Sequence, residues 1–170
     1  AILRKHLRGK GAAAIAAAAS LDFGQVDLPG PTGEANTLSL SPRGRVLCLG
    51  PDADTLLAQT IQALAAGNAV LAVAPGAVAA LSALTGKGLP LSAIDGRPDP
   101  VEARSLRVDV VAFSGTPEAS RIVRKVVASR DGPIVPLVSE VINPAAYAHE
   151  RAVCVDTTAA GGNASLLASA

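Results

Sequence analysis

Cysteine and histidine side chains are the strongest candidates for metal, redox or nucleophilic chemistry in this sequence, and their spacing limits what they could do. Cys48 and Cys154 lie far apart in the chain, which gives neither a disulfide framework nor a set of four metal ligands. His6 and His149 have no partners at ligand spacing, so a zinc site is not expected. We therefore expect two reduced structural thiols, no bound metal and a cytoplasmic protein.

Nucleophilic and acid–base sites are equally sparse. The sequence has no phosphate-binding P-loop and no G-x-S-x-G nucleophile turn. The Ser114-Gly115-Thr116 stretch is typical of a helix-capping turn, and no histidine accompanies it. Glu140 ends the last expected strand of the core domain, a position where α/β enzymes often place functional groups, although a solvated strand end explains it as well. We expect no catalytic residue in this chain.

Composition excludes several classes of function. The 170 residues carry a net charge of +1, so no electrostatic footprint points to nucleic acid or an anionic membrane. Aromatic residues make up 2% of the chain, which argues against base-stacking platforms. No stretch approaches the roughly 20 strongly apolar residues of a membrane span. The alanine-rich start favours a helix over a signal peptide, and the absence of an initiator Met suggests a piece of a longer protein.

Apolar strands that alternate with amphipathic helices predict the elements that hold these residues. Near-continuous runs of Val, Leu and Ile indicate a parallel sheet covered on both faces. The expected strands are 45–50, 69–74, 91–95, 108–115 and 134–140, and the expected helices begin near residues 52, 77, 101 and 117. Pro136 suggests an edge position for the last strand. The fold class is α/β, a Rossmann-like doubly wound sheet of about five strands.

Three segments follow from this pattern. Residues 1–44 form an N-terminal helix and an extended arm, in which Leu38 and Leu40 alternate with polar residues as in a short exposed strand. Residues 45–150 form the Rossmann-like domain. Residues 151–170 form a C-terminal β-flap.

The helix N-termini of this fold are where a dinucleotide would bind, and both are poorly suited to it. Asp52 and Asp54 follow the first strand in place of a glycine-rich turn, and either can cap the helix. Their carboxylates would repel a phosphate. After the fourth strand, Pro117 removes one N–H donor and Glu118 adds negative charge. No cofactor is expected on this chain.

The order of these segments resembles the cofactor-binding half of aldehyde dehydrogenases. The segments that carry this resemblance are RGRVLCLGP, IQALAAGNAVLAV, VDVVAFSGTPEASRIVRKV and PIVPLVSE. LPGPTGEANTLSL, GPIVPLVSE and VCVDTTAAGGNASLL resemble, more specifically, the proline utilization A family. These bifunctional bacterial enzymes join a proline dehydrogenase to an L-glutamate-γ-semialdehyde dehydrogenase, and the resemblance implies FAD and NAD in the other domains of such a parent.

Departures from the catalytic family suggest which part of that parent is present. Ala74 stands where a catalytic copy carries a lysine for the cofactor ribose. Glu140 matches the general base, but Val141 follows it where a Gly-Gly pair is usual. The domain with the nucleophilic cysteine is absent, and Cys154 does not match that nucleophile. The resemblance therefore implies the non-catalytic C-terminal domain of a long family member, which lies over the aldehyde dehydrogenase domain.

The end of the chain is small, apolar and uncharged after Asp156, which is unusual for a terminus. A strand at 153–157 offers backbone groups for pairing with a neighbouring sheet edge. We expect an interdomain flap made by Val155, Thr157, Thr158, Ala159, Ala160, Gly161, Gly162, Asn163, Ser165 and Leu166. By closing a cavity, the flap would keep a reactive aldehyde from bulk water.

Other interpretations of the sequence remain open at this point. The chain could be the NAD-binding half of an aldehyde dehydrogenase, an oligomerisation module, or a domain with an ordinary frayed terminus. The partner expected is the aldehyde dehydrogenase domain of the same or a neighbouring chain, with a homo-oligomer as a further option. Neither nucleic acid nor a membrane span is expected.

Overall fold

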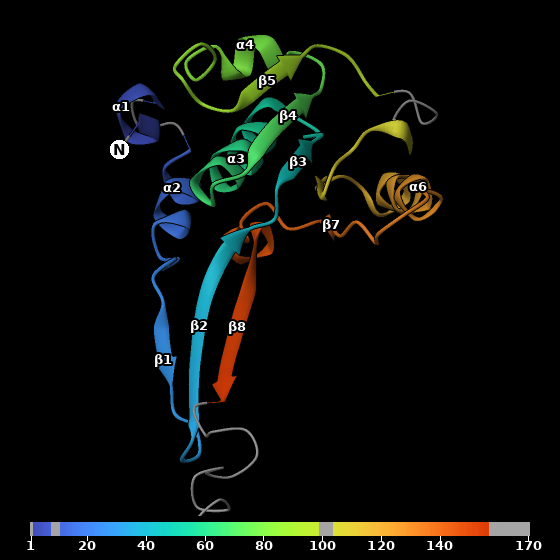
Figure 1. The fold of residues 1–170 in the computed structure, drawn as a ribbon. Helices are drawn as coiled ribbons and strands as arrows, with labels where there is room; N and C mark the ends of the chain where they lie inside the picture. The colour runs from blue at the N-terminus through green and yellow to red at the C-terminus, as the bar shows by residue number, and fades with distance from the viewer. Residues whose placement is uncertain (1, 8–10, 99–103, 157–170) are drawn as a thin grey trace, which may run out of the picture. The chain divides into compact units, whose positions relative to one another are not determined.

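The computed structural model describes residues 2–7, 11–98 and 104–156. The described residues divide into two compact units. The Rossmann unit consists of those within 1–22 and 42–149, and the arm consists of those within 23–41 and 150–170. Figure 1 labels the helices and strands of both units.

A five-stranded parallel sheet forms the centre of the Rossmann unit, in the order β5-β4-β3-β6-β7. The strands are β3 (Arg45–Cys48), β4 (Ala69–Val73), β5 (Leu91–Ile94), β6 (Val110–Ala112) and β7 (Leu137–Val138). The predicted α/β sheet is thus confirmed. β7 is two residues long and lies at an edge, as Pro136 predicts, because proline cannot donate a ladder hydrogen bond.

Side chains that alternate along the strands supply the two faces of this sheet. Cys48 is fully buried on the face covered by α3 (Ala53–Ala65), and Leu47 packs on the opposite face with Val123 and Val127 of α6 (Pro117–Ala128). Helices therefore cover both faces. Eight consecutive residues of α3 are buried, whereas α6 has no buried residue.

The N-terminal segment forms two helices where the sequence predicted one. These are α1 (Ile2–Leu7) and α2 (Ala12–Ala18), and α2 packs against α3. Gly11 lies between them with φ = 68°, and a Cβ atom there would collide with Ile61 of α3. The close approach and the left-handed backbone both require glycine.

Helices elsewhere begin near their predicted positions but are shorter. α4, for example, spans Ala77–Leu81. The 3₁₀ helix η1 (Pro144–Tyr147) was not predicted. The predicted helix near residue 101 falls partly outside the described residues. Within the described part of the chain, no helix is long and apolar enough to cross a membrane.

A three-stranded sheet forms the arm, in the order β1-β2-β8. β1 (Val26–Leu28) pairs antiparallel with β2 (Glu34–Pro42), so the segment predicted as a short strand is a hairpin with a nine-residue second strand. β8 (Ala148–Asp156) completes the sheet (Figure 1). Every residue of β8 after Ala148 is exposed, so this sheet buries almost no apolar core of its own.

Candidate functional site

Strand order identifies where a ligand would bind in a sheet of this kind. The chain runs from β3 to β4 and β5 on one side, and then places β6 on the other side of β3. The order of strands reverses between β3 and β6, and ligands of open α/β sheets bind at the carboxyl ends of the strands at such a point. Gly50 and Ser114, which follow β3 and β6, flank this position.

A side chain of the protein itself occupies this position. Gln59 of α3 is fully buried, and its Oε1 accepts a hydrogen bond from the Gly50 N–H at 3.1 Å. Its Nε2 lies 3.4 Å from the Gly50 carbonyl oxygen and 3.3 Å from Ser114 Oγ. The Ser114 N–H also donates to the Gly50 carbonyl, at 3.3 Å. The backbone groups that would meet a pyrophosphate are therefore bonded to Gln59 and to each other.

The N-terminus of α3 is capped by one of the two predicted carboxylates. Asp52 is the N-cap, and its Oδ1 accepts from the Thr55 N–H at 2.9 Å. Its Oδ2 accepts from the Thr55 hydroxyl at 2.9 Å, and these bonds hold the pKa of Asp52 below its usual value. Asp54 lies in the first turn and adds a second negative charge. A bound anion would compete with both carboxylates.

The N-terminus of α6 is built in the same manner. Thr116 is the N-cap, and its Oγ1 accepts from the Ala119 N–H at 3.3 Å. Pro117 follows without an N–H, and Glu118 lies in the first turn, 3.8 Å from Arg121. The predicted capping role of the Ser114-Gly115-Thr116 turn is thus confirmed for Thr116.

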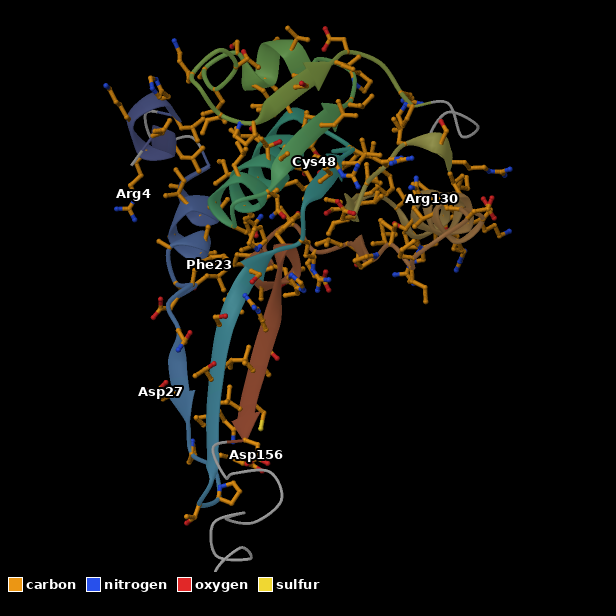
Figure 2. The ribbon with its side chains drawn as sticks, in the orientation of Figure 1. Arg4, Phe23, Asp27, Cys48, Arg130 and Asp156 are labelled. Carbon is orange, nitrogen blue, oxygen red and sulfur yellow. The ribbon has the colours of Figure 1, made fainter. Side chains whose placement is uncertain are left out.

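Neither cysteine has the surroundings of a nucleophile. Cys48 lies on β3 (Figure 2) and is fully buried, and burial raises the pKa of its thiol to about 12. Cys154 is exposed on β8. Its pKa is raised by desolvation and then by the neighbouring Glu34 carboxylate, with a smaller effect of Asp156. A thiolate is the reactive form, so these shifts reduce the reactivity of both residues.

Buried amides that were not predicted from the sequence fix the segment that follows Glu140. Gln62 of α3 donates to the Val141 carbonyl at 2.8 Å and accepts from the Asn143 N–H at 2.7 Å. Asn68 donates to the carbonyl of Tyr147 at 2.9 Å and accepts from the Gly44 N–H at 2.8 Å. These bonds hold residues 141–147 against α3 without any ligand.

Polar residues inside the apolar pattern of α3 were the available signal for these amides. Gln59 and Gln62 lie three residues apart among buried residues of the helix, which is the spacing of one helix face. The partners of Gln62 could not be inferred, because Val141 lies 79 residues away in the sequence.

Glu140 and the flap residues are the remaining predicted positions. Glu140 is exposed two residues beyond β7. Its charge raises the pKa of the buried Tyr147 phenol, after the larger effects of burial and of Cys48. Val155 lies on β8 and is 51% exposed. The other flap residues, from Thr157 to Leu166, lie outside the described residues.

A cavity lies beside the ligand position, on the α6 face of the sheet. Its volume is about 430 Å³, and Leu47, Val73 and Val111 of the sheet contribute to one wall. Ile122 and Val126 of α6 contribute to the opposite wall. The apolar face predicted for α6 is therefore present, and it lines this cavity.

Several known proteins are similar to this chain in sequence. The chain is 40% identical over 149 residues to the bifunctional protein PutA of Escherichia coli, which covers 82% of this chain and 11% of that protein. It is 37% identical over an alignment of 183 positions to PutA of Rhizobium meliloti, which covers 96% of this chain and 14% of that protein. No protein-family model matches.

Solved structures agree with the sequence relatives. A crystal structure of bifunctional proline utilization A superposes with a TM-score of 0.64 at 30% identity, over 80% of this chain and 15% of that one. The chain is a PutA-related domain with an aldehyde dehydrogenase-like fold. A betaine aldehyde dehydrogenase from Staphylococcus aureus, solved with NAD⁺, shares this fold with a TM-score of 0.59 at 20% identity, over 75% of this chain and 28% of that one. The resemblance read from the sequence is confirmed.

The extent of the PutA-related domain is small compared with its relatives. It spans 11% of the E. coli protein and 14% of the R. meliloti protein.

Proposed function

We propose that this PutA-related domain is a non-catalytic structural domain of a bifunctional proline-catabolic enzyme. Its arm and C-terminal flap pack on the L-glutamate-γ-semialdehyde dehydrogenase domain, of the same or a neighbouring chain, and help to close the cavity that channels the intermediate. FAD and NAD belong to the other domains of this cytoplasmic parent.

The three-stranded sheet of the arm is the observation that carries the proposal. β8 is nine residues long and exposed from His149 to Asp156, with Val153 38% and Val155 51% exposed. Val26 and Leu28 of β1 are exposed as well. A sheet with so little buried surface gains little stability by itself. Packing on another domain would bury these side chains and supply the missing hydrophobic contacts.

The position of β8 at the end of the strand order supports strand pairing with a partner. β8 is the last strand in the order β1-β2-β8, so among the described strands only β2 pairs with it. An exposed strand edge presents N–H and C=O groups that an extended segment can pair. The flap residues that follow continue from this strand.

The closed state of the ligand position supports a non-catalytic role. Gln59 bonds the Gly50 backbone, Asp52 caps α3, and Cys48 is buried with a raised pKa. None of these groups is poised to act on an aldehyde. The contribution of the domain would then be geometric: an enclosed cavity keeps a reactive aldehyde or its cyclic imine away from bulk water.

Removal of residues 156–170 from a full-length parent tests this role. The proline dehydrogenase and aldehyde dehydrogenase activities are measured separately, and the coupled reaction is followed for a lag. We expect weaker aldehyde oxidation or a new lag, with proline oxidation unchanged. Unchanged values in all three assays would refute the lid.

A matched pair of substitutions separates docking from general damage. Val155→Lys places a charge on β8, and Val78→Lys places the same charge on α4, where the valine is 47% exposed. Only Val155→Lys is expected to reproduce the effect of the truncation. Equal effects of the two variants would argue against docking through β8.

NAD binding is the second candidate, because the chain shares its fold with the S. aureus enzyme solved with NAD⁺. Isothermal titration of NAD and NADP into the chain distinguishes the two. Heat of binding at millimolar cofactor would favour a dehydrogenase half, whereas no heat favours the structural domain.

A further inference from the structure

The cavity beside α6 is not used by the proposed structural role. It lies within the Rossmann unit, between α6 and the carboxyl ends of β3, β4 and β6, and its volume is about 430 Å³. This volume falls within the range of small-molecule sites. Ile122 is 61% exposed although it lies on the apolar face of α6. Val123 and Val127 of α6 pack against the sheet, whereas Ile122 presents its aliphatic side chain to the open space of the cavity.

The apolar side chains that line the α6 cavity favour a ligand with an aliphatic body. Leu47, Val73 and Val111 line it from the sheet, and Val123 and Val126 line it from α6. Aliphatic walls of this kind stabilise an apolar ligand by removing its surface from water.

The charged side chains that line the α6 cavity favour a ligand with a negatively charged end group. Among the described residues, the charged side chains that line it are Arg97 and Arg130, and no carboxylate does so. Arg97 is exposed, and Arg130 donates to the Leu106 carbonyl. Among the described lining residues, an anionic group would therefore meet two positive charges, of which Arg130 also interacts with the Asp109 carboxylate. The charge of the lining complements a carboxylate.

Phosphate is a poor choice for this anion. The Gly50 N–H is bonded to Gln59, the Ala119 N–H is bonded to Thr116, and Pro117 has no N–H. A pyrophosphate would find few of the backbone donors that helix N-termini normally offer. From the aliphatic walls and the arginines, we infer that the α6 cavity binds an aliphatic monocarboxylate, with its chain between α6 and the sheet and its carboxylate at Arg97.

Isothermal titration of the 170-residue chain tests this site. The probes are hexanoate, octanoate and decanoate below their micellar concentrations, each compared with the alcohol of equal length. Affinity is expected to rise about fourfold per added methylene until the cavity is filled. Each alcohol is expected to bind about threefold more weakly than its acid, because it lacks the charge.

Two substitutions at the cavity and two control substitutions outside it test where the probes bind. Arg97→Ala should weaken octanoate about threefold to fivefold and leave octanol unchanged. Ala119→Phe places a ring in the cavity and should abolish both. Arg121→Ala on α6, whose arginine does not line this cavity, and Ala79→Phe on the exposed side of α4 should leave binding unchanged. Circular dichroism verifies that each variant is folded.

Several results would overturn the inference. These are no heat with any acid, equal binding of acids and alcohols, affinity independent of chain length, or octanoate binding unaffected by both Arg97→Ala and Ala119→Phe. Displacement of octanoate by NAD would assign the cavity to a nucleotide instead and would also overturn it.

Discussion

Gln59→Leu is the substitution that most sharply tests the closed ligand position. Leucine keeps most of the volume of the glutamine side chain and removes both of its polar atoms. The two hydrogen bonds that Nε2 donates are 3.3 and 3.4 Å long, so their removal counts for little. The Gly50 N–H loses its 3.1 Å acceptor in a buried site.

The cost of that one unsatisfied donor sets the magnitude of the effect. Burial of an amide N–H without a partner costs about 1–3 kcal/mol, so Gln59→Leu should lower the free energy of unfolding by about that much. Urea unfolding followed by circular dichroism measures the change. Gln25→Ala, at an exposed position of the arm, is the control and should stay within about 0.5 kcal/mol of the parent protein.

The same variant also addresses the function of the position. If Gln59 merely blocked a working cofactor site, its replacement would allow NAD to bind. We expect no NAD binding to Gln59→Leu, because Asp52 and Asp54 still occupy the N-terminus of α3. A loss of stability below about 0.5 kcal/mol, or NAD binding that appears on substitution, would refute the reasoning.

Three further predictions concern buried and capping side chains of the same unit and the two thiols. Asn68→Leu removes bonds to Gly44 and Tyr147 in a fully buried site, and urea unfolding should show a loss of about 2–5 kcal/mol; a neutral result would contradict the assigned role. Asp52→Ala should cost about 1 kcal/mol at pH 7. The pKa of Asp52 is lowered in the folded state, so its stabilising contribution is present above the unfolded pKa and is lost as pH falls through the folded pKa. The difference in unfolding free energy between the parent protein and Asp52→Ala, measured by urea unfolding, should therefore shrink below about pH 4. A difference that stays constant with pH would argue against the cap. A thiol reagent should label Cys154 in the folded chain and Cys48 only after unfolding; rapid labelling of Cys48 under native conditions would contradict its burial.

Local rules explain which features of the fold could be predicted. The parallel sheet follows from short runs of Val, Leu and Ile, since strands buried on both faces carry no polar alternation. Asp52 was a predictable cap, because capping depends on neighbours only three residues away. Pro136 indicated an edge strand for the same kind of local reason.

Features that depend on distant segments could not be predicted. Gln62 and Asn68 bond backbone groups 79 residues away, and nothing in the sequence around them identifies those partners. The close approach of Gly11 to Ile61 of α3 likewise joins residues 50 positions apart. The apolar face of α6 was visible as a helical period, but the cavity that it lines depends on what else covers that side of the sheet.

Of the predicted flap residues, only Val155 lies among the described residues. Val155 lies on the exposed strand β8. The role of the whole set therefore rests on the proposal and on the truncation that tests it.

Hydrogen–deuterium exchange along β8 is the most direct measurement of the central claim. The amides of residues 149–156 are compared between the 170-residue chain and a full-length PutA-type parent that contains it. If β8 packs and pairs with the aldehyde dehydrogenase domain, these amides will exchange markedly more slowly in the parent, while those of α3 will change little. Equal exchange of β8 in both proteins would contradict docking of the arm, and with it the proposed role of the domain.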